Sequence, residues 1–141
     1  MFEVKKFVEF DEQEKQLFRE SIQAREEAYA IYSNFKVGTA LLSKSGKIYT
    51  GCNVENSSFS LSTCAERTAV VKAVSEGEKE FNKIAVCGLK EGQFVSPCGS
   101  CRQVLNEFAQ SSHMEVYLVK PSQTEVLKTN LKYLLPLAFN L

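Results

Sequence analysis

Segments with strand and helix patterns alternate along this chain, and their order constrains the fold more than any other feature of the sequence. An amphipathic helix is expected over residues 11–31, followed by two strand-forming stretches, 36–43 and 47–54, on either side of a turn at 44–47. Further along, the pattern predicts a helix at 64–77 closed by Gly77, a strand at 83–90, a helix at 98–110, a strand at 114–120 and a helical turn at 130–136. This alternation predicts an α/β fold of three layers, α-β-α, around a central mixed sheet with parallel pairing in its second half.

Length and charge narrow the class of protein. The chain has 141 residues, which is the length of one domain with its own core, so a single domain is expected over residues 1–141. Seventeen Lys and Arg residues balance seventeen Asp and Glu residues, which disfavours a nucleic-acid partner. The N-terminal stretch lacks the apolar core of a signal peptide, and the apolar stretch at 133–139 is too short to span a bilayer. We therefore expect a cytoplasmic protein with no membrane partner.

The cysteines limit the chemistry of any metal site. The chain has five cysteines but a single histidine, so a metal site here must be built mostly from thiolates. Cys98 and Cys101 follow Pro97 at the start of a predicted helix, where residues three apart share a face. Such a pair can bind a metal, but a strand followed by Cys-x-x-Cys at a helix start is also the context of thioredoxin-like redox sites. The pair alone leaves both interpretations open.

A second short pattern decides between them. Residues 63–67 place Cys64 at the start of the other central helix, with Glu66 two positions on. A redox dithiol has no use for these residues, whereas a hydrolytic zinc centre needs three protein ligands, an open position for water and a carboxylate that moves protons. One Zn²⁺ ion per chain is thus predicted, with three thiolate ligands: Cys64, Cys98 and Cys101. Glu66 is the predicted catalytic carboxylate.

A purely structural zinc site is the alternative for these cysteines. Such a site is closed by a fourth protein ligand, which here would be Cys52, Cys87 or His113. Without that role, Cys52 and Cys87 are interpreted as small buried strand residues, and His113 as a solvated loop residue. The presence of Glu66 favours an open, catalytic site.

The two motifs together indicate a family. Cys-Ala-Glu followed by Pro-Cys-x-x-Cys is the pattern of zinc nucleobase deaminases, in which the glutamate is not a ligand. The chain resembles the small, single-domain cytidine deaminases with three cysteine ligands, through the blocks 32–41, 51–59, 64–69, 97–108 and 134–139. This resemblance implies hydrolysis of cytidine and deoxycytidine to uridine and deoxyuridine with release of ammonia, a reaction of pyrimidine salvage.

The resemblance also implies which residues bind the nucleoside. Asn53 and Glu55 would hold the ribose, chiefly its 3′-hydroxyl, and they share a face of an extended segment. Phe35 would wall the pyrimidine pocket, and the backbone N–H of Ala65 would bind the base carbonyl. Phe139 would stack on the base in a neighbouring subunit's site, since the family's small enzymes are homotetramers.

Some residues depart from the family pattern. Lys36 and Ser60 stand where proline is common, and Ser62 where glycine is usual. They lie in loops that shape the pocket, so they bear on substrate fit rather than on the metal or the proton carrier. Two rival functions therefore remain: a related deaminase acting on a cytosine-bearing nucleotide, nucleoside antibiotic or RNA, and a non-enzymatic zinc or redox module.

The charge of the predicted site suggests a role for two arginines. Zinc with three thiolates carries a net charge of −1, which is a poor setting for activating water. The two helix N-termini can offset this charge, as can Arg67 and Arg102, each of which directly follows a site residue. We predict that one or both arginines donate hydrogen bonds to the ligand sulfurs.

Overall fold

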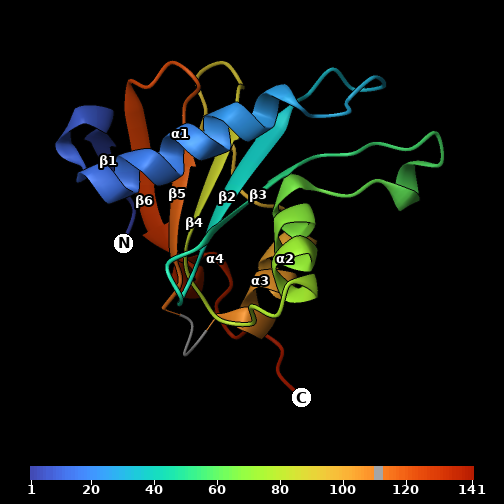
Figure 1. The fold of residues 1–141 in the computed structure, drawn as a ribbon. Coiled ribbons are helices and arrows are strands. Elements are labelled where there is room, and N and C mark those ends of the chain that lie inside the picture. Colours follow the sequence, from blue (N-terminus) through green and yellow to red (C-terminus); the bar gives the residue numbers. More distant parts are fainter. Residues whose placement is uncertain (110–112) are drawn as a thin grey trace.

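A six-stranded mixed sheet lies at the centre of the computed structural model, which describes residues 1–109 and 113–141 (Figure 1). The strands lie in the order β1 (Glu3–Lys6), β6 (Glu125–Asn130), β5 (Glu115–Val119), β4 (Phe81–Gly88), β2 (Val37–Ser43) and β3 (Ile48–Cys52). Strands β4 and β5 are parallel, and the other neighbouring pairs are antiparallel. The predicted α/β class with a mixed sheet is confirmed, although parallel pairing in its second half is limited to β4 and β5.

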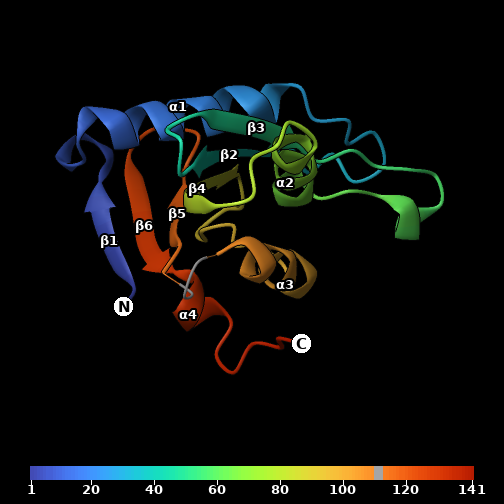
Figure 2. The same cartoon turned by 60° about the horizontal axis from the view of Figure 1, so that its bottom comes forward.

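Helices cover both faces of this sheet. Helix α1 (Glu12–Glu26) lies on one face, and α2 (Ala65–Ser75) and α3 (Gly99–Phe108) lie on the other (Figure 2). The short helix α4 (Leu131–Leu134) follows β6 and contacts α3. Among the described helices, none has both the length and the apolar character needed to cross a membrane.

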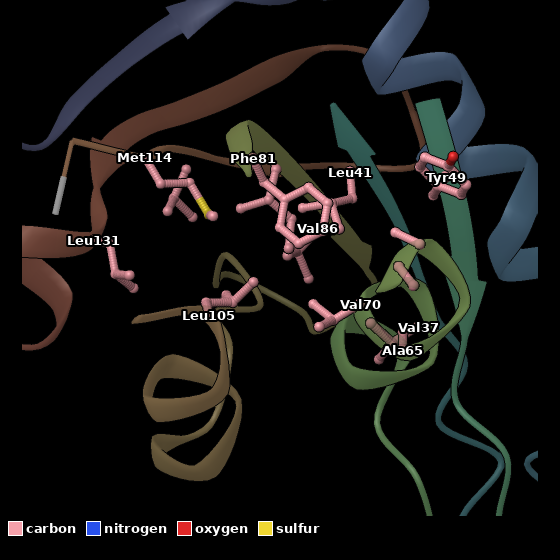
Figure 3. Close-up of a cluster of buried hydrophobic side chains, with 14 of the residues drawn as sticks. Val37, Leu41, Tyr49, Ala65, Val70, Phe81, Val86, Leu105, Met114 and Leu131 are labelled. Carbon is pink, nitrogen blue, oxygen red and sulfur yellow. The ribbon is translucent and has the colours of Figure 1, made fainter. Parts of the chain in front are cut away.

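Alternate strand residues supply two separate cores. Neighbouring residues of β4 point to opposite faces, so Ala85 packs in the cluster under α1 and Val86 in the cluster under α2 and α3. Figure 3 shows the second cluster, in which Leu41 and Val86 from the sheet lie near Val70 of α2 and Leu105 of α3. This cluster fixes the two helices whose first turns carry the cysteine motifs.

Strands β1 and β6 were not predicted. Strand β6 follows β5 after the short connection 120–124, and so short a connection permits only antiparallel pairing. Strand β1 pairs with β6 in the register Val4 with Leu127, so the N-terminal strand lies beside a strand more than a hundred residues later in the sequence. No local pattern in four residues indicates a pairing over that sequence distance.

The boundaries of two helices also differ from the prediction. Helix α1 ends at Glu26 rather than at residue 31, because Tyr29 enters a bridge with Val54 and donates its N–H to the carbonyl of Asn53 at 3.0 Å. Helix α3 ends at Phe108 in the structure, and its predicted last residue, 110, lies outside the described residues. Strand β4 begins two residues before the predicted start at 83.

The starts of α2 and α3 follow the prediction closely. Cys64 and Cys98 are the N-cap residues of these helices, and both have extended backbone. Neither side chain caps its own helix, so both sulfurs remain available to other partners. Gly77, with φ +95°, follows the last turn of α2 and ends it in the left-handed conformation that glycine tolerates.

Candidate active site

Three cysteines from the two central helices form one cluster. The Sγ atoms of Cys64, Cys98 and Cys101 all lie within 4.8 Å of one another. Tetrahedral zinc with Zn–S bonds of about 2.3 Å places its sulfur ligands about 3.8 Å apart. The cluster is therefore of the size that a zinc ion requires, and it joins residues that lie far apart in the sequence.

The alternative fourth ligands are not part of this cluster. Within the residues that the structure describes, Cys52, Cys87 and His113 do not join the three sulfurs as a potential metal-binding group. Cys87 is fully buried in the core under α1, on the opposite face of the sheet, and His113 is exposed. Cys52 is half-buried, so its interpretation as a buried strand residue holds only in part. The arrangement favours a three-cysteine site over one closed by a fourth cysteine or histidine.

The surroundings of Cys64 favour its thiolate. Hydrogen bonds from the Cys101 thiol and from Arg67 lower the pKa of Cys64 to about 5, although burial acts in the opposite direction. The Arg67 guanidinium donates from Nη2 to Cys64 Sγ at 3.2 Å. The N-terminus of α2 adds a partial positive charge at the same place. The predicted contact between Arg67 and a ligand sulfur is confirmed.

The prediction that one or both arginines make such a contact is met by Arg67, and the hydrogen bonds of Arg102 to the described residues go elsewhere. The Arg102 guanidinium donates to the backbone carbonyls of Pro97 and Leu134, both at 2.8 Å, and to the Ser96 hydroxyl at 3.3 Å. These contacts hold the loop before α3 against the C-terminal segment. Arg102 therefore shapes the position of the loop rather than the charge on a sulfur.

Glu66 lies inside the protein next to the cysteines. Its side chain is 5% exposed, and its Oε2 atom is 3.7 Å from the Sγ atom of Cys101. Burial is the largest effect on this carboxyl group, and together with the nearby charge of Cys64 it raises the pKa of Glu66 to about 7. A carboxyl group in this setting can both accept and release a proton near neutral pH.

Two adjoining cavities open beside this cluster. The smaller, of about 210 Å³, lies against Glu66; its lining includes Phe35, Ala65, Val95 and Cys98. The larger, of about 450 Å³, is lined by Tyr32, Ser33, Glu55, Phe59, Ser62 and Thr63. Asn53 and Cys64 line both cavities. The two cavities therefore lie side by side, with the cysteine cluster and the buried carboxyl group next to the smaller one.

The predicted nucleoside-binding residues of this site come from three segments. Phe35 precedes β2, Ala65 is the first residue of α2, and Asn53 and Glu55 follow β3. The Asn53 amide binds the neighbouring backbone, since Oδ1 accepts from the Val37 N–H and Nδ2 donates to the Phe35 carbonyl, both at 2.8 Å. Asn53 thus fixes the segment that brings Phe35 to the smaller cavity.

Phe139 is not brought to this site within its own chain. It lines neither cavity, and its side chain is 70% exposed. Its backbone carbonyl accepts hydrogen bonds from Gln103 at 3.0 Å and from Asn106 at 3.4 Å, which attach the C-terminal segment to α3. The Phe139 ring therefore remains on the surface.

Comparison with known proteins identifies the family. A family model described as the cytidine and deoxycytidylate deaminase zinc-binding region matches residues 11–118, which include both cysteine motifs and Glu66. The chain belongs to this deaminase family. The deaminase is 51% identical over 126 residues to a cytidine deaminase of Sporosarcina psychrophila, with 89% of this chain and 90% of the relative covered. It is 46% identical to a cytidine deaminase of Halalkalibacterium halodurans over 123 residues, with 87% of this chain and 91% of the relative covered.

Solved structures agree with this assignment. The crystal structure of a cytidine deaminase from Burkholderia pseudomallei has a TM-score of 0.82 and 47% sequence identity to the deaminase described here. The match covers 88% of this chain and 97% of that chain. Zinc is thus the cofactor of this deaminase, and the donor set of three clustered cysteines, one of them with a lowered thiol pKa, fits that ion.

The sequence prediction missed residues that complete the site of the deaminase. The backbone N–H groups of Tyr32 and Ser33 donate to Glu55 Oε1 at 3.0 and 3.1 Å, and the Ser33 hydroxyl donates to Glu55 Oε2. These bonds lower the pKa of Glu55 below its usual value, with the Ser33 hydroxyl as the largest cause. In the sequence, Tyr32 and Ser33 were indicated only by their position in the block 32–41, just before Phe35.

Proposed function

We propose that this protein hydrolytically deaminates cytidine and deoxycytidine, giving uridine or deoxyuridine and ammonia. One observation carries the proposal: a buried carboxyl group, Glu66, lies beside a three-cysteine cluster and lines the smaller of two neighbouring cavities. Asn53 and Glu55 line the larger cavity, which has the polar groups suited to a sugar. A planar base in the smaller cavity and a sugar in the larger cavity match this division.

In this proposal Cys64, Cys98 and Cys101 hold one zinc ion per chain. Zinc bound there would supply a Lewis acid that activates water for attack on C4 of the cytosine ring. Arg67 stabilises the thiolate of Cys64 through its hydrogen bond. This contact raises the affinity of the site for a cation that requires deprotonated cysteines.

Glu66 carries the protons of the reaction. It accepts a proton from the attacking water, delivers a proton to ring N3 and then helps to protonate the departing amino group. The oxygen of the water remains on C4, and the amino group leaves as ammonia. The buried position of Glu66 keeps bulk water away from these transfers.

The other site residues orient the nucleoside. Phe35 offers an aromatic face to the flat base. Ala65 is the first residue of α2, so its backbone N–H has no partner within the helix and is free to bind the base carbonyl. Asn53 and Glu55 would bind the ribose, chiefly its 3′-hydroxyl, and such contacts discriminate against sugars that lack this group.

The lining of the larger cavity supports a nucleoside rather than a nucleotide. The described residues that line it include the carboxylate of Glu55 and no Lys, Arg or His. A 5′-phosphate would meet a negative charge there without a basic partner. The same observation disfavours a polynucleotide substrate.

We further propose the assembly and cellular setting. Residues 1–141 would act as one domain within a homotetramer, in which Phe139 stacks on the base bound by a neighbouring subunit. The exposed ring of Phe139 supports this arrangement. The enzyme would work in the cytoplasm in pyrimidine salvage, a location supported by its five free cysteines.

A substrate panel tests the proposed function. Ammonia release would be measured with cytidine, deoxycytidine, cytosine, CMP and adenosine, each with and without a zinc chelator. We expect rapid release from the two cytosine nucleosides alone and its loss on chelation. Faster release from CMP would indicate a nucleotide deaminase instead, and no release from any compound, together with a reducible Cys98–Cys101 disulfide, would indicate a redox module.

A further inference from the structure

The hydroxyl group of Ser33 has two hydrogen-bond partners, of which one is a donor and the other an acceptor. It accepts a hydrogen bond from the backbone N–H of Phe35 at 3.0 Å and donates one to Oε2 of Glu55. A serine hydroxyl carries a single proton. Because an ionised carboxylate can only accept and the Phe35 N–H can only donate, the Ser33 hydroxyl gives its proton to Glu55 and accepts from Phe35 through a lone pair.

The backbone between these residues maintains that geometry. Asn34 has φ +57°, a left-handed conformation that asparagine tolerates better than most residues. This conformation turns the chain so that the Phe35 N–H points back to the hydroxyl two positions earlier. Ser33 is therefore held by the segment that also brings Phe35 to the smaller cavity.

Three donors from this segment occupy most of the Glu55 carboxylate. The N–H groups of Tyr32 and Ser33 reach Oε1, and the Ser33 hydroxyl reaches Oε2. An ionised carboxylate has about four acceptor positions, so about one remains for a ligand. The Ser33 hydroxyl is the donor that holds Oε2, so it limits the directions from which a ligand can approach the remaining acceptor position.

We propose that Ser33 is a positioning residue for sugar recognition: its hydroxyl orients the Glu55 carboxylate toward one hydroxyl group of the nucleoside sugar. This inference rests on the proposed function, in which Glu55 binds the ribose. Ser33 itself makes no contact with the reacting atoms in this scheme. Its loss therefore affects the affinity for the sugar rather than the chemical step.

The test compares Ser33→Ala with Ser33→Thr on two substrates, cytidine and 3′-deoxycytidine. For cytidine, Ser33→Ala is expected to raise KM about tenfold with kcat changed less than about threefold, as for one lost hydrogen bond to a charged group. For 3′-deoxycytidine, which lacks the hydroxyl group that Glu55 would bind, Ser33→Ala is expected to raise KM less than about threefold. Ser33→Thr keeps a hydroxyl and should retain a KM for cytidine near that of the parent.

Controls separate this role from a general loss of structure. Ser57→Ala removes the hydroxyl of an exposed serine in the segment after β3 and should leave both KM values unchanged. Zinc content and circular dichroism check the folding of each variant. If Ser33→Ala does not fold, the folded Ser33→Thr variant decides. A Ser33→Thr variant whose KM is raised equally for cytidine and for 3′-deoxycytidine overturns the inference. A Ser33→Thr variant whose KM for cytidine stays near that of the parent supports it.

Two outcomes distinguish failure of this inference from failure of the proposed function. In the first outcome, the parent enzyme favours cytidine over 3′-deoxycytidine, but Ser33→Ala impairs the reaction of both substrates equally or of neither. This result overturns only the role of Ser33. A parent enzyme that does not deaminate cytidine, or does not distinguish the two sugars, overturns the assignment on which the inference rests.

Discussion

At the scale of single residues, the proposed chemistry depends on the carboxyl group of Glu66, which is buried and lies close to the cysteine cluster. Glu66 lies in the first turn of α2, two positions after Cys64, and its carboxyl oxygen approaches Cys101 of α3. This position allows Glu66 to act on a ligand in the smaller cavity while Cys64 faces the metal site. We therefore propose different roles for the two side chains despite their proximity in sequence.

Glu66→Gln is expected to abolish turnover while the fold and the zinc site are retained. Glutamine has nearly the same shape but cannot carry a proton, so kcat should fall by at least about 10²-fold, the usual contribution of a positioned general acid or base. Ammonia release and zinc content would be measured on the same preparation. Substantial residual turnover in a zinc-loaded variant would argue against Glu66 as the proton carrier.

Arg67→Gln is expected to weaken zinc binding. The variant loses the charged hydrogen bond to Cys64 Sγ, and changes of this kind next to a ligand cost about 10- to 100-fold in metal affinity. Competition with a chromogenic chelator measures this affinity. Lys72→Gln is the matched control, because it removes an exposed positive charge from the same helix without a contact to sulfur. Unchanged zinc affinity and turnover in Arg67→Gln would refute the role of Arg67.

At the scale of elements, the site depends on the close packing of β3 against α2. A Cβ atom at Gly51 would lie 2.4 Å from the carbonyl oxygen of Ala65 and 2.5 Å from the backbone nitrogen of Ala69. Both atoms belong to the backbone of α2, which cannot move aside without a shift of the whole helix. Glycine at position 51 therefore sets the distance of Cys64 and Glu66 from the sheet.

Gly51→Ala should both destabilise the protein and impair the site. The added methyl group forces α2 away from β3, with an expected cost of about 1–3 kcal/mol, as for other overpacked positions. Thermal unfolding measures the stability, and zinc affinity reports the displaced Cys64. Gly99→Ala is the control for stability, since a Cβ atom there meets nothing within 4 Å. Equal melting temperatures for the two variants would contradict this view of the packing.

The elements also show what could be predicted from the sequence. The starts of α2 and α3 were predictable because Cys64 with Glu66, and Cys98 with Cys101, are local motifs on periodic helices. The cavities were not, because the connection after α1 and the segment after β3 meet through the bridge between Tyr29 and Val54. That long-range pairing also ended α1 early.

The two arginines illustrate the same limit. Arg67 and Arg102 each follow a site residue directly, but only Arg67 contacts a ligand sulfur among the contacts of the described residues. Arg102 finds a competing acceptor in the carbonyl of Leu134, which the C-terminal segment brings to α3. A contact made by the fold over such a sequence distance cannot be inferred from spacing.

At the scale of the whole molecule, the C-terminal segment is fixed in place but its aromatic side chain faces outward. Asn106 donates to the side-chain oxygen of Asn140 at 3.0 Å, and Gln103 donates to the backbone carbonyl of Phe139 at the same distance. The backbone of this segment is thus attached to α3, while Phe139 is available to a second subunit. In the proposed homotetramer, the Phe139 ring stacks on the base bound by a neighbouring subunit.

Mixed oligomers test whether Phe139 acts on a neighbouring site. Phe139→Ala alone should lose about 10- to 100-fold in kcat/KM, as for one lost base stack, and Glu66→Gln alone should be inactive. Refolding the two variants together in equal amounts should restore activity in about a quarter of the sites, those in which an intact Glu66 meets an intact Phe139 from its neighbour. A mixture no more active than its components would show that Phe139 serves its own chain or none.

The central claim is that three cysteines hold one catalytic zinc ion per chain. The most direct measurement is to remove the metal with a chelator, return zinc in measured steps and follow ammonia release from cytidine alongside the bound metal. The account predicts a metal-free protein that is folded but inactive, and activity that rises linearly until one zinc ion is bound per chain. Full activity in the metal-free protein, or zinc binding without any gain in activity, would contradict it.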